Sequence, residues 1–152
     1  RLVDNEGRPV AGLLVYTYHA DREGLYGSKA YPEFPSMAGC VRSGPGGGFV
    51  VRTHVPGMYE GPPHMHFEVY RSLNTATSYS NKLKTSQLAF PVATCQDVYN
   101  NASGYSASVN NLTSISFASD NVFSDGYSTE LVSITGDVNQ GYVATIVIGI
   151  SV

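Results

Sequence analysis

The sequence predicts an all-β fold, a single-domain β-sandwich over residues 1–152 with long loops and little helix. Three observations lead to this prediction. Several short segments are apolar or alternate between apolar and polar residues, and they are bounded by glycine and proline. Only 14% of the residues are charged, whereas Gly, Ser, Thr, Asn and Tyr are abundant. No amphipathic helix of ten or more residues is visible in the pattern.

The elements follow in order along the chain. Residues 10–20 are apolar or aromatic at almost every position, which predicts a strand buried on both faces. A turn that carries Tyr26 is expected over residues 21–27. The proline- and glycine-containing segment 28–48 is expected to be a long loop, a type of segment that is often functional. Further strands are expected over 49–55, 64–70, 84–90, 131–134 and 141–152, with one or two helical turns over 95–101 and weak patterning over 102–128.

Length and charge narrow the classes of function. At 152 residues the chain is long enough to bury the core of one domain. The formal net charge is -3 and no cluster of Lys and Arg exists, so we expect no nucleic-acid partner. No apolar run approaches the ~18–20 residues of a membrane span, so we expect no membrane partner. The expected state is a monomer or a homodimer.

Two features favour a secreted protein. The chain begins at Arg1 without a Met, which is compatible with removal of a leader. Asn101 and Asn111 each begin an Asn-x-Ser/Thr triplet, the acceptor for N-glycosylation.

The spacing of Cys40 and Cys95, the two cysteines, fits no zinc motif. A single disulfide or two buried thiols is the preferred interpretation, and a nucleophile or metal ligand is the alternative.

The most informative segment is Pro62-Pro63-His64-Met65-His66-Phe67-Glu68-Val69-Tyr70. Successive side chains of a strand point to opposite faces, so His64 and His66 share one face while the apolar residues between them fill the other. A strand anchored in the core from behind is a rigid support for two metal ligands. The pattern therefore predicts a metal site, with Tyr59 in the preceding Pro-Gly-Met-Tyr turn as a further candidate ligand.

Three motifs follow one another along the chain: the segment 12–26 ending in Gly-Leu-Tyr26, the turn Pro56-Gly57-Met58-Tyr59, and the His64-Met65-His66 strand. In this order they resemble the intradiol ring-cleavage dioxygenases, the catechol and protocatechuate 3,4-dioxygenase group, and most of all their short secreted fungal members. Segment 85–88 and the tail 120–150 are also similar, so the resemblance spans nearly the whole chain.

The resemblance implies that Tyr26, Tyr59, His64 and His66 bind Fe(III), although another transition metal is possible. It implies that Gln87 lines the substrate pocket and that the protein cleaves a small aromatic diol with dioxygen to a muconate. Phenolate oxygen is a hard anionic donor, which suits ferric iron, a hard Lewis acid. His19 and His54 are expected to be structural or to lie behind the ligands.

One position departs from the family pattern. The family carries an arginine shortly before the first histidine, and Gly61 stands here at the corresponding position. Arg42, Arg52 and Arg71 are out of register with it. Two alternatives therefore stay open beside the dioxygenase. In one, the same metal site acts without oxidation on another substrate such as a saccharide, as a lyase or hydrolase; in the other, the chain is a non-catalytic binding module.

Overall fold

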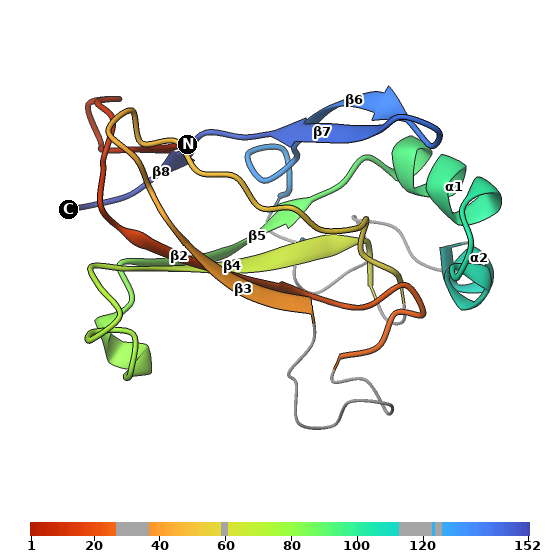
Figure 1. Cartoon of the computed structure of the whole chain (residues 1–152), viewed down its shortest axis with the longest axis horizontal. Helices are drawn as coiled ribbons and strands as arrows, with labels where there is room; N and C mark the ends of the chain where they lie inside the picture. Colours follow the sequence, from red (N-terminus) through yellow and green to blue (C-terminus); the bar gives the residue numbers. More distant parts are fainter. Residues whose placement is uncertain (27–36, 59–60, 113–122, 124–125) are drawn as a thin grey trace.

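The computed structural model describes residues 1–26, 37–58, 61–112, 123 and 126–152. Its largest part is an antiparallel sheet in the order β3-β2-β4-β5, built from Met37–Arg42, Leu14–His19, His64–Tyr70 and Lys84–Ala89. Two smaller sheets pair β1 (Leu2–Val3) with β8 (Ile148–Gly149) and β6 (Ser133–Asp137) with β7 (Gly141–Thr145). They lie over one face of the large sheet (Figure 1), and the predicted all-β sandwich is confirmed.

A first hydrophobic core fills the space between these layers. Val15 of β2 and Val69 of β4 are partners in the sheet register, and both side chains are fully buried. They pack with a set of apolar residues from β4, from both ends of the chain and from the segment before β2: Leu2, Leu13, Phe67, Ile148 and Ile150. Burying one such side chain is worth about 1.5–3 kcal/mol, so this core fixes one face of the large sheet.

Two helices lie at one end of the sandwich (Figure 1): α1 (Val92–Asn101) and α2 (Ser106–Leu112). A short 3₁₀ helix, Tyr79–Asn81, lies in the connection between β4 and β5. The expectation of no helix of ten residues is wrong, because α1 has 10. Its buried stripe, Cys95, Val98 and Tyr99, is narrow and set among polar residues, so the sequence pattern was weak. The helix is stabilised because these three side chains pack in a second hydrophobic core.

Three strand predictions need correction. β3 lies inside the expected loop 28–48; its side chains are nearly all exposed and show no alternation, so only its backbone pairing with β2 defines it. Residues 49–55 are expected to be a strand but form none, and Val50 is 74% exposed. The tail 141–152 divides into β7 and β8, because its two parts pair with different strands.

The cysteines and the two sequons differ in their surroundings. Cys40 on β3 is exposed, Cys95 in α1 is buried, and both are free. The two preferred interpretations were a disulfide or two buried thiols, and neither therefore holds. Asn101 is exposed, whereas Asn111 is half-buried and its amide donates a hydrogen bond to the Met58 carbonyl. Asn101 is thus the more accessible acceptor. No helix within the described ranges is long and apolar enough to cross a membrane.

His19, at the end of β2, is a buried structural residue with 1% exposure. Its Nδ1 lies 2.6 Å from the Ala20 carbonyl oxygen, and its Nε2 lies 2.7 Å from Oγ1 of Thr53. Nδ1 therefore carries the proton and donates to the carbonyl, while Nε2 accepts from the threonine hydroxyl. Burial lowers the pKa of His19 from 6.5 to about 4.

This lowered pKa predicts a loss of stability in mild acid. Between pH 6.5 and 4 the unfolded chain protonates His19 and the folded chain does not, so protons favour unfolding. Relative to pH 7, we expect the group to remove about 2 kcal/mol of unfolding free energy at pH 5. Urea unfolding of the wild type and of His19→Gln at both pH values measures this. Equal pH dependence in the two proteins would refute the assignment.

Candidate metal centre

β4 is the second strand from one edge of the large sheet, and its two faces have different environments. Met65, Phe67 and Val69 are buried, whereas His64 and His66 are partly exposed on the opposite face. The alternation predicted from the sequence is confirmed. Since the apolar side chains anchor the strand in the core, the two imidazoles are held on a rigid backbone.

The two histidines converge on one point. His64 Nε2 and His66 Nε2 lie 3.0 Å apart, with the rings at 87° to each other. His64 Nδ1 lies 2.7 Å from the Pro62 carbonyl oxygen, so Nδ1 carries the proton and Nε2 keeps a free lone pair. Burial, reinforced by the neighbouring His64, lowers the pKa of His66 to about 4. Both features suit imidazoles that bind a metal in their neutral form.

Tyr26 lies beside this pair. Its hydroxyl oxygen is 3.5 Å from His64 Nε2, and its ring centre is 6.1 Å from that of His66. The side chain is about half exposed, and burial of the rest raises the pKa of Tyr26. The structure thus brings together three of the four predicted ligands. Tyr59, the fourth, lies outside the described residues.

The turns that precede the two tyrosines pack against each other. In the first turn, Oδ1 of Asp21 accepts hydrogen bonds from the backbone N–H groups of Glu23 and Leu25. In the second, the N–H of Gly57 donates to the Asp21 carbonyl at 3.0 Å. A Cβ on Gly57 would lie 2.3 Å from that carbonyl oxygen and 2.5 Å from the Arg22 carbonyl oxygen. Only glycine therefore allows this close approach.

Helix α2 holds both turns in place. Oγ of Ser108, a fully buried residue, donates to the Arg22 carbonyl and accepts from the Met58 N–H, both at 2.9 Å. The Asn111 amide donates to the Met58 carbonyl at 2.7 Å. Met58, the residue before Tyr59, is thus fixed on both sides of its backbone. No sequence pattern indicated this role, because α2 falls in a weakly patterned, Ser- and Asn-rich stretch.

Gln87 flanks the histidine pair on β5, where it is the register partner of His66. Paired residues project from the same face of a sheet, so the Gln87 side chain lies on the histidine face. Its Nε2 donates to Oε1 of Glu130 at 2.8 Å. Glu130 was not predicted as a site residue; it lies in the tail 120–150, where the resemblance indicated no particular residue.

Two aromatic neighbours were also missed. Tyr18 of β2 stacks on the His66 ring, with centroids 4.7 Å apart and planes at 16°. Phe123 lies edge-on to His64 at 5.8 Å and is 1% exposed. The register of β2 with β4 places Tyr18 opposite His66, and the sequence of β2, apolar or aromatic at almost every position, carries no signal for that pairing. These contacts restrict the rotation of both imidazoles.

Glu68, two residues beyond His66 on the same face, is committed elsewhere. Its Oε1 pairs with the Lys82 ammonium at 3.2 Å, and its Oε2 accepts the Tyr70 hydroxyl at 2.5 Å. Across the described ranges, no three His, Cys, Asp or Glu side chains gather as a metal-binding group. Among the residues that the structure describes, the donors at the histidine pair are therefore two imidazole nitrogens and a phenol oxygen. That mixture of nitrogen and hard oxygen donors fits a transition metal such as iron.

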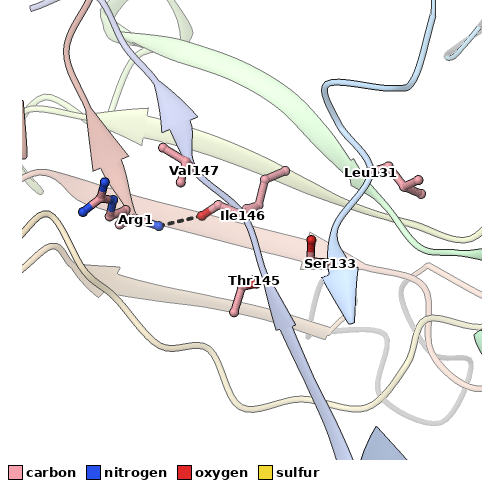
Figure 2. Close-up of a pocket in the computed structure, with 6 residues that line it drawn as sticks. All are labelled: Arg1, Leu131, Ser133, Thr145, Ile146 and Val147. Carbon is pink, nitrogen blue, oxygen red and sulfur yellow. Dashed lines mark hydrogen bonds between the residues drawn. The ribbon is translucent and has the colours of Figure 1, made fainter. Parts of the chain in front are cut away.

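An open recess lies on another part of the molecule, between the chain start and the β6–β7 hairpin (Figure 2). It is lined by Arg1, Leu131, Ser133, Thr145, Ile146 and Val147. The Arg1 α-amino group donates to the Ile146 carbonyl at 2.8 Å. None of the four predicted site residues that the structure describes lines this recess, and the residues that do line it carry few polar side chains. We therefore place the candidate site at the histidine pair.

The arrangement of the chain is shared with known dioxygenases. The intradiol ring-cleavage dioxygenase from Tetranychus urticae superposes on 99% of this chain and 77% of its own length, with a TM-score of 0.77 and 21% identity. The dioxygenase domain of a dioxygenase carbohydrate-binding protein fusion from Streptomyces sp. SirexAA-E gives a TM-score of 0.61 at 20% identity, over 99% of this chain and 75% of its own.

A third similar structure is the 3-chlorocatechol 1,2-dioxygenase from Rhodococcus opacus 1CP, with a TM-score of 0.61, 21% identity, and coverage of 99% of this chain and 56% of its own. No family model and no curated protein matches the chain. The chain therefore has the fold of the intradiol ring-cleavage dioxygenases, and the resemblance seen in the sequence is confirmed at the level of the fold.

The contact between the two tyrosine-bearing turns predicts a large cost for Gly57→Ala. The new Cβ would meet two carbonyl oxygens of the backbone, which cannot rotate away, so the turns must separate. We expect a loss of about 3 kcal/mol in unfolding free energy, measured by urea titration. Gly39→Ala is the matched control, because nothing lies within 4 Å of its added Cβ. An equally small change in both variants would contradict the packing described.

Proposed function

We propose that the chain is an intradiol dioxygenase that uses ferric iron to cleave small catechol-type aromatics with dioxygen, giving muconates. The observation that carries the proposal is the convergence of His64 Nε2, His66 Nε2 and the Tyr26 hydroxyl on one point. The fold shared with dioxygenases from three organisms supports it. Tyr59 is proposed as the fourth ligand, from the sequence motif.

Each side chain has a defined task in this proposal. Ferric iron, when bound, supplies a Lewis acid and a template on which the diol and dioxygen meet. His64 binds through Nε2 because its Nδ1 proton is committed to the Pro62 carbonyl. Tyr18 stacks on His66 and keeps its ring in the binding orientation. Tyr26 would bind the metal through its oxygen as a phenolate, and this oxygen would accept a proton from an incoming diol hydroxyl.

The visible absorption spectrum of the natively purified protein tests the proposal directly. We expect a broad tyrosinate-to-iron band that shifts when catechol is added without air, followed by muconate absorbance when air is admitted. A band that ignores catechol would overturn the diol substrate and keep the metal. Iron-free protein that gains no band after loading with ferric iron would overturn the metal assignment.

Substitution of either histidine tests which residues hold the metal. We expect His64→Ala and His66→Ala to lose most of the bound metal, measured by elemental analysis. The fold should persist in both, measured by circular dichroism, since a sandwich of 152 residues buries enough apolar surface without the ion. His54→Ala is the control, because His54 contacts His19 rather than the pair. Equal metal loss in all three variants would contradict the assignment.

A second candidate function keeps the metal site but uses it on another substrate, such as a saccharide, without oxidation. The observation that favours it is the conformation of Gly61, which has φ of 84° where the family carries an arginine. An L-residue at that φ is strained by roughly 1–2 kcal/mol, so the local backbone is adapted to glycine. Depolymerisation that needs metal but consumes no dioxygen would favour this candidate.

Two of the arginines lie far from the histidines along the sheet. Arg42 pairs in register with Leu14, which pairs with Tyr70 at the far end of β4, and Arg71 follows Tyr70. At about 3.3 Å per residue, that end lies roughly 20 Å from His64. Neither arginine therefore replaces the family's cation from where it lies.

The location outside the cell remains a prediction that glycan analysis at Asn101 would test.

A further inference from the structure

The amide of Gln87 is held by a carboxylate that no motif indicated. Gln87 Nε2 donates to Oε1 of Glu130 at 2.8 Å, and the Ser86 hydroxyl donates to the same oxygen at 2.6 Å. The other oxygen, Oε2, is buried and has no hydrogen-bond partner among the described residues. A buried carboxylate oxygen without a hydrogen-bond partner is uncommon in folded proteins.

The position of Glu130 explains how one carboxylate reaches both residues. Ser86 and Gln87 are consecutive in β5, so their side chains project to opposite faces. β5 is an edge strand, and a group beside that edge can contact both faces. The Glu130 backbone is fixed there, because its carbonyl accepts from the Ala89 N–H at 2.8 Å.

The chemistry of the pair determines which way the amide turns. A glutamate carboxylate accepts hydrogen bonds and has no proton to donate, and its Oε1 here already accepts the Ser86 hydroxyl. The nitrogen of Gln87 must therefore face Glu130, and the carbonyl Oε1 of Gln87 must face away from it. Because Gln87 is the register partner of His66, its side chain leaves the strand on the face that holds the two imidazoles.

We propose that Glu130 is a positioning residue, which turns the Gln87 amide so that its carbonyl oxygen presents a hydrogen-bond acceptor beside the histidine pair. This carbonyl oxygen accepts a hydrogen bond from a hydroxyl of the aromatic ligand that does not bind the metal. The acceptor therefore favours aromatic triols over catechol. The positioning stands on the contacts of Glu130 alone, whereas the triol preference rests on the proposed function.

The positioning is tested without metal or turnover. The chain has three glutamines, Gln87, Gln96 and Gln140, so the side-chain amide signals in a nitrogen–proton spectrum are readily assigned with Gln87→Met. We expect the Gln87 amide protons to exchange with water at least tenfold faster in Glu130→Ala than in the wild type. Glu130→Gln should restore slow exchange, because its amide oxygen still accepts. Unchanged exchange in Glu130→Ala overturns the proposal.

The acceptor role is tested by anaerobic titration of the iron-loaded protein with catechol and with 1,2,4-trihydroxybenzene. We expect the triol to bind the wild type more tightly, and the ratio of the two affinities to fall about 3- to 10-fold in Glu130→Ala and Gln87→Met. Glu130→Gln should keep the ratio. Ser86→Ala, which removes the other hydrogen bond to Glu130 and leaves Gln87 intact, should also keep it.

Two failures can be told apart in these measurements. Wild-type protein that binds neither diol nor triol overturns the proposed function and the triol preference, while the exchange rates still decide whether Glu130 positions Gln87. An affinity ratio that is the same in wild type, Glu130→Ala and Gln87→Met overturns the acceptor role, even where the iron band and catechol turnover are present.

Discussion

The alternation of β4 is the constraint on which the candidate site depends. Met65, Phe67 and Val69 are buried on one side of the strand, so the opposite side must carry His64 and His66. A shift of the register by one residue would exchange the faces and place both imidazoles in the core. The buried apolar side chains therefore fix the direction of the metal-binding side chains, and the same interaction that stabilises the sheet prepares the site.

The remaining parts of the site reach β4 through contacts between distant segments. Gly57 brings its turn against Asp21, and Ser108 of α2 bonds to the backbone of both turns. Tyr26 is thereby placed 3.5 Å from His64 by residues far from it in the chain. These contacts hold Tyr26, which is half-exposed and not part of a strand. They leave its oxygen accessible to a ligand.

Sequence reasoning succeeded where one local pattern decided the outcome and failed where pairing decided it. The His-x-His strand was correctly predicted because the alternation of apolar and polar residues along it shows which face is buried. β3 was missed because its edge position leaves both faces exposed, so no alternation appears. Residues 49–55 alternate but do not pair, and α1 buries only a narrow stripe of three residues. In each case the partner surface, which the local sequence does not encode, decided the element.

By itself, the sequence determined the all-β class, the face that His64 and His66 share, and the resemblance to the intradiol dioxygenases, because these follow from the period of a strand and from short contiguous motifs. Only the tertiary structure decided that Tyr26 reaches His64, that Tyr18 stacks on His66, and that Glu130 holds Gln87. Those contacts join residues separated by many positions. They depend on register and packing between layers, which no local pattern of residues specifies.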